Sequence, residues 1–150
     1  MFDISPLSGY MLHQDSAVLE KQRAMAKAFN LPIVWGTSPE LEGRTLSVAR
    51  DANVPAIYSE YRGGDYRTEG VDSLVSGCLN VLKYFGMLEN QVTPGKPKYF
   101  VEDDKPGSGH LQVMHPAPEE GLFVATVNLG DLVTKGDKLG YLLRESGEKG

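Results

Sequence analysis

Apolar residues recur at three- and four-residue steps between positions 71 and 85, which is the clearest periodic pattern in the chain. Such spacing places the residues on one stripe of an α-helix. The stripe consists of Val71, Leu74, Val75, Cys78, Leu79, Leu82 and Phe85. We expect it to face a packed core, where Leu79→Ala would cost about 2–5 kcal/mol. Because Cys78 lies within the stripe, we expect its thiol to be buried and inert rather than nucleophilic.

Weaker patterns upstream predict an alternation of helices and strands. Apolar positions in residues 17–29 favour a helix with Asp15 or Ser16 as its N-cap and Asn30 as its stop. The other expected elements are strands at 31–36 and 56–60 and a short helix at 45–52. Residues 1–14 show no clean period. The alternation of strand and helix favours a parallel sheet with helices on its faces.

The pattern changes after residue 88. Residues 89–97 end in a linker-like Thr-Pro-Gly-Lys-Pro run, and short apolar segments separated by Gly- and Pro-rich turns follow. We therefore predict two domains, a partial α/β domain at residues 1–90 and a partial β domain at residues 95–150. The expected fold class is α/β, with a mainly parallel sheet and flanking helices followed by a small all-β unit of barrel or sandwich type.

Composition narrows the functional classes. The 150-residue chain is 41% hydrophobic and 23% charged, as is typical of globular proteins. A net charge of −5, with basic residues scattered among acidic ones, argues against nucleic acid as a partner. No apolar run is long enough to span a membrane, and the first residues lack the order of a signal peptide. The single cysteine cannot form an internal disulfide, so we expect a cytoplasmic protein.

The common motifs of metal and nucleophile sites are missing from the sequence. The three histidines, at positions 13, 110 and 115, begin neither a His-x-x-Glu nor a His-x-x-x-His pattern. The acidic run at residues 102–104 is expected to be solvated loop charge. Neither a Gly-x-Ser-x-Gly turn nor a Walker-type phosphate loop is present. The sequence alone therefore predicts no metal site.

One stretch still concentrates chemically useful side chains, at the end of the predicted strand 56–60. The carboxyl end of a strand in an open α/β sheet presents groups to a cleft, which makes Glu60 a candidate general acid–base. Alternation along the strand places Tyr58 on the same side as Glu60. Arg62 or Arg67 in the following loop could bind a carboxylate. The alternative is a solvated glutamate at an ordinary junction between strand and loop.

Three blocks of sequence together resemble a known family. They are residues 53–61 (Asn-Val-Pro-Ala-Ile-Tyr-Ser-Glu-Tyr), residues 71–88 (ending Tyr-Phe-Gly-Met-Leu) and residues 115–137 (beginning His-Pro-Ala-Pro-Glu-Glu-Gly). In this order they resemble the carboxy-terminal portion of the succinylglutamate desuccinylase/aspartoacylase family. Its members are zinc-dependent N-acyl-amino-acid deacylases related to the zinc carboxypeptidases. The resemblance implies a carboxypeptidase-like α/β fold.

The resemblance also implies a mechanism. Zinc activates a water, the glutamate matching Glu60 transfers its proton to the leaving amine, and arginines hold the carboxylate of the N-acyl amino acid. Arg50 and Arg62 are the candidates for that binding. The family's His-x-x-Glu ligands would precede this chain, and Ser5 follows Asp3-Ile4 where a histidine ligand is expected. We therefore expect this chain alone to bind zinc poorly and to hydrolyse nothing.

Two functional interpretations stay open. The first is a truncated relative of a zinc-dependent deacylase, and the second is a non-catalytic binding or assembly module that keeps the second half of the fold. A parallel sheet without its first strands has an open edge, so we also expect a homo-oligomer that pairs at this edge.

The third block also resembles half of a biotinyl/lipoyl-type barrel, in which a modified lysine lies at the tip of a hairpin. Lys135 lies instead in a Val-Thr-Lys-Gly-Asp turn. We interpret this segment as β turns held by Gly130 and Gly136.

Overall fold

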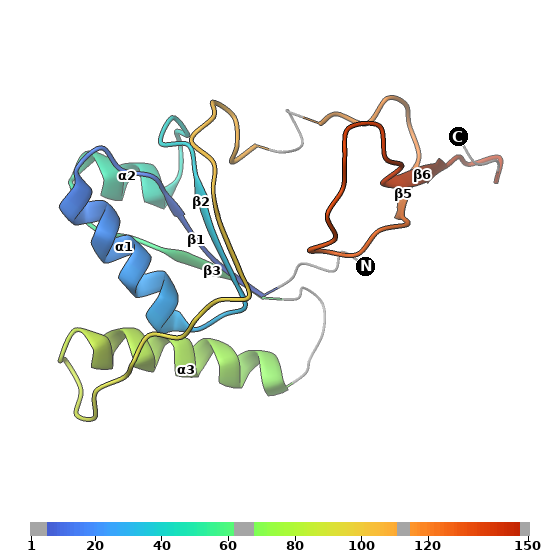
Figure 1. Ribbon diagram of the computed structural model, residues 1–150. Helices are drawn as coiled ribbons and strands as arrows, with labels where there is room; N and C mark the ends of the chain where they lie inside the picture. The colour runs from blue at the N-terminus through green and yellow to red at the C-terminus, as the bar shows by residue number, and fades with distance from the viewer. Residues whose placement is uncertain (1–5, 62–67, 111–114, 148–150) are drawn as a thin grey trace. The chain divides into compact units, whose positions relative to one another are not determined.

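The computed structural model describes residues 6–61, 68–110 and 115–147 (Figure 1). The chain divides into two compact units, Met1–Gly109 and His110–Gly150. The division falls later than the domain boundary expected near residue 95. Residues 99–109, which the sequence analysis assigned to the β domain, belong to the first unit because a strand within them joins its sheet.

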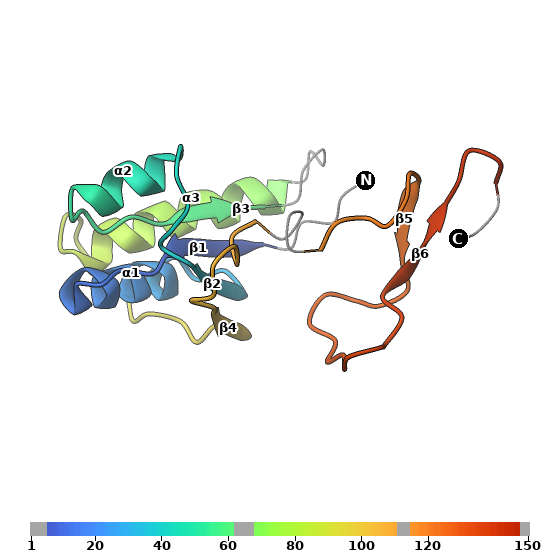
Figure 2. The same ribbon diagram turned by 90° about the horizontal axis from the view of Figure 1, so that it is seen from above.

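The first unit is built around a four-stranded sheet. Its strands are β1 (Leu7–Met11), β2 (Ile33–Thr37), β3 (Tyr58–Glu60) and β4 (Tyr99–Glu102). Figure 2 shows them in the order β3-β1-β2-β4. Strands β1, β2 and β4 run parallel, so the predicted mainly parallel sheet is confirmed. Strand β3 runs antiparallel to β1, unlike the parallel strand that the sequence pattern favoured at 56–60.

Helix α1 (Ser16–Phe29) begins and ends as its sequence predicts. The Asp15 carboxylate accepts hydrogen bonds from the backbone N–H groups of Ala17 and Val18, at 2.7 and 3.3 Å. Asn30 then takes the left-handed conformation at φ 67°, which an asparagine tolerates at a helix end. Helix α1 covers the sheet face that carries Tyr10 and Val34, and Ala26 lies fully buried against them.

Helix α3 (Thr68–Tyr84) confirms the predicted helix but not the predicted packing of its apolar stripe. The helix packs on α1, where Gly77 lies so close to the Phe29 ring that a Cβ atom at this position would overlap it. The stripe lies beside this contact, and most of its side chains are exposed, from 38% at Leu82 to 62% at Val71. Cys78 is exposed as well, so the expectation of a buried thiol is wrong.

The described part of the second unit contains a two-stranded antiparallel sheet of β5 (Leu122–Ala125) and β6 (Gly140–Leu143). The barrel or sandwich expected for this unit stays a prediction.

Two turns of the same design lie between β5 and β6. The Asp131 carboxylate accepts the backbone N–H of Asn128 at 2.7 Å, and the Asp137 carboxylate accepts that of Thr134 at 2.8 Å. A glycine with positive φ precedes each aspartate, Gly130 at 94° and Gly136 at 103°. The expected β turns at Gly130 and Gly136 are therefore confirmed, and Lys135 lies within the second of them.

Helix α2 (Thr45–Asp51) connects β2 to β3 and contacts β1. Among the described residues, no helix has both the length and the apolar character needed to cross a membrane.

Candidate functional site

Glu60 lies at the carboxyl end of β3 with its side chain exposed. Because β3 runs antiparallel to β1, Glu60 pairs with Leu7 at the start of β1 rather than lying at the carboxyl ends of the parallel strands. The cleft argument from an all-parallel sheet therefore does not apply to this position. Within the described residues, the Glu60 carboxylate has no hydrogen bond and no ion pair.

Tyr58 lies on the same side of β3 as Glu60, two positions earlier, and its ring lies over Gly9 of β1. Burial raises the pKa of the Tyr58 hydroxyl to about 12, and the negative charge of Glu60 acts in the same direction. The positive charge of Arg44 opposes this rise in pKa. Tyr58 therefore keeps its proton at neutral pH and can donate a hydrogen bond.

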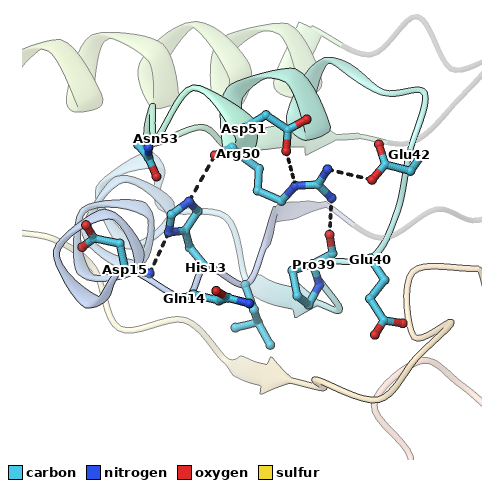
Figure 3. Close-up of a pocket in the computed structure, with 10 residues that line it drawn as sticks. His13, Gln14, Asp15, Pro39, Glu40, Glu42, Arg50, Asp51 and Asn53 are labelled. Atoms are coloured by element: carbon cyan, nitrogen blue, oxygen red, sulfur yellow. Dashed lines mark hydrogen bonds and ion pairs between the residues drawn. The ribbon is translucent and has the colours of Figure 1, made fainter.

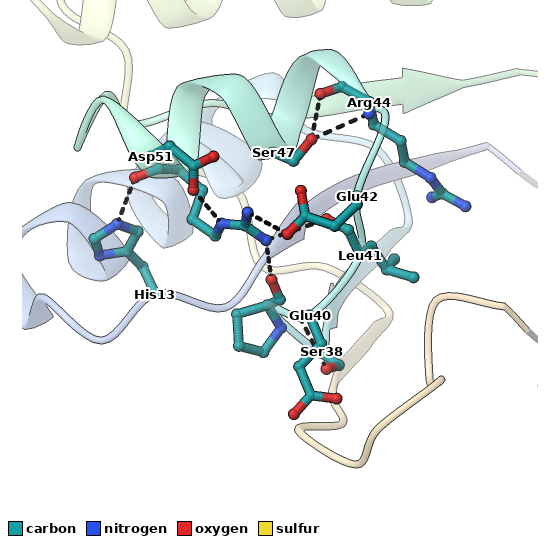
Figure 4. A network of polar contacts seen from close by, with 10 residues as sticks. His13, Ser38, Glu40, Leu41, Glu42, Arg44, Ser47 and Asp51 are labelled. Atoms are coloured by element: carbon teal, nitrogen blue, oxygen red, sulfur yellow. Dashed lines mark hydrogen bonds and ion pairs between the residues drawn. The ribbon is translucent and has the colours of Figure 1, made fainter.

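Arg44 is a candidate site residue that sequence reasoning missed. It immediately precedes α2, where the Ser47 hydroxyl accepts its backbone N–H at 3.1 Å and donates to its carbonyl at 2.6 Å (Figure 4). The exposed guanidinium points away from Asp51, and Nη2 lies 3.5 Å from the Gly109 carbonyl oxygen. No local motif marks Arg44, because only the fold brings it near Tyr58.

Arg50, the predicted carboxylate binder, holds a loop in place. Nε donates to Asp51 and Nη2 donates to Glu42, both at 2.8 Å (Figure 3). Nη1 donates to the carbonyl oxygens of Pro39 and Leu41, the second at 3.1 Å. These contacts use four of the five N–H groups of a guanidinium. A substrate carboxylate could bind Arg50 bidentately only by displacing them. The other candidates, Arg62 and Arg67, lie outside the described residues.

An open pocket of about 540 Å³ lies at the carboxyl ends of β1 and β2 (Figure 3). Its charged lining residues are Asp15, Glu40, Glu42, Asp51 and Arg50. The carboxylates outnumber the arginine, which is already occupied, so the pocket is a poor place for an anionic substrate.

His13 also lines this pocket, and both of its ring nitrogens are engaged. The backbone N–H of Asp15 donates to Nδ1 at 2.9 Å, so the ring proton is on Nε2, which donates to the Arg50 carbonyl oxygen at 3.2 Å. His13 is thus part of the framework that joins the end of β1 to α2. Across the part of the chain that the structure describes, no group of three or more His, Cys, Asp and Glu side chains is arranged to hold a metal ion.

A separate, half-buried network joins three elements of the first unit. Arg23 of α1 donates from Nε and Nη2 to the two carboxylate oxygens of Glu102 in β4, at 2.8 and 2.7 Å. The Tyr10 hydroxyl of β1 donates to the same carboxylate at 2.6 Å. The hydrogen bonds from Arg23 hold the pKa of Glu102 below its usual value, while burial raises the pKa of Tyr10.

This network crosses over β2 at Gly36. A Cβ atom there would lie 2.9 Å from both the Glu102 Cγ atom and the Tyr10 ring, which is closer than real side chains approach. Because the Glu102 carboxylate is paired with both Arg23 and Tyr10, we interpret the network as structural rather than catalytic.

No protein-family model matches the chain, and no curated protein matches it. Solved structures do match it. They include a succinylglutamate desuccinylase/aspartoacylase from Rhodobacter sphaeroides, with a TM-score of 0.71 and 22% identity. The ectoine utilization protein EutE (DoeB) from Ruegeria pomeroyi, in its apo form, gives 0.72 and 22%. A succinylglutamate desuccinylase from Silicibacter sp. TM1040 gives 0.73 and 20%.

These matches cover 95%, 98% and 98% of this chain but only 42%, 46% and 44% of the other three. The chain therefore has the fold of part of the succinylglutamate desuccinylase/aspartoacylase structures and spans less than half of their length. The predicted resemblance is confirmed at the level of the fold.

Proposed function

We propose that Glu60 is the general acid–base residue for hydrolysis of the amide bond of an N-acyl amino acid. The observation that carries this proposal is the exposed Glu60 carboxylate, unpaired within the described residues and on the same side of β3 as Tyr58. A carboxylate without a competing cation can accept a proton from water and deliver it to the leaving amine. The fold shared with deacylase structures supports the same chemistry.

Two other side chains, Tyr58 and Arg44, suit the substrate side of this reaction. The Tyr58 hydroxyl, protonated at neutral pH, can donate a hydrogen bond to an acyl oxygen. The guanidinium of Arg44 is exposed and can bind a carboxylate bidentately. We therefore propose Arg44, rather than the occupied Arg50, as the binder of the substrate carboxylate among the described residues.

The described residues do not fit the zinc ion that the resemblance implies. Among them, no group of three or more His, Cys, Asp and Glu side chains is arranged to hold a metal ion. The proposed role of Glu60 is therefore limited to moving a proton, and no step through a metal is assigned to this chain.

The test is hydrolysis of N-acetyl and N-succinyl amino acids, with and without added zinc. Where turnover is measurable, Glu60→Gln should lower kcat by about 100-fold or more, because the amide cannot transfer the proton. The matched control is Glu40→Gln, which removes another exposed carboxylate from the same unit and should leave kcat unchanged. Equal turnover by wild type and the Glu60 variant would contradict the proposal.

The second candidate function is a non-catalytic binding or assembly module. It is favoured by the arrangement of Arg50 and His13, whose polar groups hold the framework instead of facing a ligand. Absence of hydrolysis with every substrate, together with far less than one bound zinc per chain, would favour this candidate over the deacylase.

A further inference from the structure

The proposed function does not use the exposed apolar face of α3. This face consists of Val71, Val75, Cys78, Leu79 and Leu82 of the helix and of Phe85 directly after it, all exposed. Helix α3 packs on α1 around Gly77, beside this face. We propose that a second copy of this chain covers this face, in a twofold dimer with the two α3 helices packed antiparallel.

The face is complementary to itself in this arrangement. Val71 and Phe85 each lie seven positions from Cys78, one before it and one after it. A twofold axis beside Cys78 therefore places Val71 of one copy opposite Phe85 of the other. The contact repeats on both sides of the axis, as an isologous interface requires. Helical rise makes the paired segment about 21 Å long.

Charge along the helix favours the antiparallel direction. Asp72 and Lys83 are eleven positions apart, which places them within about 20° of each other on the same flank of the apolar face. They lie six positions before and five positions after Cys78. The twofold axis thus brings Asp72 of each copy opposite Lys83 of the other, whereas a parallel pair would keep them at opposite ends. Neither residue has an ion pair within the described part of its own chain.

The apolar face of α3 is a better binding surface for a second copy than the edges of the sheet, where the sequence led us to expect pairing. The edge strands β3 and β4 contain three and four residues. Strands this short offer few unpaired backbone groups to another chain, and short edges are one way in which proteins avoid pairing. A long apolar helix face offers more surface to bury.

Charge reversal tests the arrangement in the full 150-residue chain. Sedimentation velocity at about 1 to 100 µM should show a dimer for wild type, and Asp72→Lys or Lys83→Asp alone should raise the dimer dissociation constant about tenfold or more. The double variant Asp72→Lys/Lys83→Asp restores both pairs with their signs exchanged, so its dissociation constant should return to within about threefold of wild type. Circular dichroism confirms that each variant is folded.

Two results would overturn the proposal. One is a wild-type monomer over the whole concentration range. The other is a dimer that both single reversals leave unchanged, which would place the contact elsewhere, for example at a sheet edge.

Cys78 supplies an independent measure of geometry. Next to the twofold axis, two Cys78 thiols are close enough to be oxidised by copper-phenanthroline and oxygen to one disulfide, with loss of two protons and two electrons to the oxidant. The control is Val48→Cys in a Cys78→Ser background, which places one exposed thiol on α2. Wild type should form the linked dimer at least about tenfold faster than the control. Equal rates would indicate random collision and contradict the proposed interface.

Discussion

At the scale of single residues, the structure separates charged groups that hold the fold from groups that are open to a ligand. Arg23, Glu102 and Arg50 are engaged by partners on other segments. Glu60, by contrast, has no such partner within the described residues. Sequence reasoning found Glu60 and Tyr58 because strand alternation is a local property. It did not find Arg44, whose position near Tyr58 depends on how α2 packs.

Glu102→Gln should destabilise the first unit by about 2 to 3 kcal/mol, since it removes the charge that accepts hydrogen bonds from Arg23 and Tyr10. Chemical denaturation monitored by circular dichroism measures the loss. Glu20→Gln is the matched control. Glu20 also pairs with Arg23 but is exposed, so its replacement should cost less than about 1 kcal/mol.

The Glu102→Gln variant also tests how the stability of the first unit depends on pH. The folded pKa of Glu102 is lowered from 4.5, so its contribution is fully present above that pH and is lost as the pH falls through the lowered value. Wild type should therefore lose more stability than Glu102→Gln between about pH 6 and pH 3. Parallel curves for the two proteins would contradict an ionised Glu102 in the fold.

At the scale of elements, local sequence signals predicted where helices begin and end, but they did not predict the surfaces on which the helices pack. The cap at Asp15 and the stop at Asn30 depend only on residues close to them in the sequence, so the ends of α1 were predicted closely. Strand β1 was missed because Ser8 and Gly9 break its apolar pattern, although both are buried. The stripe of α3 was assigned to the core because periodicity reveals an apolar face but not the surface against which the helix packs.

Gly77→Ala tests how α3 is docked. The new methyl group overlaps the Phe29 ring, so the variant should lose about 1 to 2 kcal/mol even though alanine favours helix over glycine by about 1 kcal/mol. Ser76→Ala, next to it and exposed, should change stability by less than about 0.5 kcal/mol. In a Phe29→Leu background, Gly77→Ala should cost less stability than it does in the wild type, because the leucine side chain is smaller than the phenylalanine ring. A stabilising Gly77→Ala would contradict the close contact of α1 and α3.

At the scale of the whole molecule, the chain consists of two units that are stabilised by different interactions. The first has a sheet with helices and a buried core at Tyr10, Ala26 and Val34. The described part of the second has two paired strands and two aspartate-held turns. The order of strands in the first unit could not be read from the sequence, because β4 joins β2 across more than sixty intervening residues.

Division of the chain between Gly109 and His110 should leave one folded piece. The fragment 1–109 is expected to unfold cooperatively, with a Tm within about 5 °C of the first-unit transition in the full chain. The fragment 110–150 should show no cooperative transition, because a two-stranded sheet alone is marginally stable. Differential scanning calorimetry measures both. Loss of the transition in fragment 1–109 would show that its core depends on the second unit.

The side chains that cross over Gly36 also bear on how the first unit folds. Tyr10 and Glu102, joined by one hydrogen bond, are 92 positions apart in the chain. The neighbouring strands β1 and β2 are linked by α1 alone, so their contacts close a much shorter loop and cost less chain entropy. We therefore expect the β1-α1-β2 segment to form first and strand β4 to dock on it afterwards. In this order the gap at Gly36 that receives Glu102 would form before the glutamate reaches it.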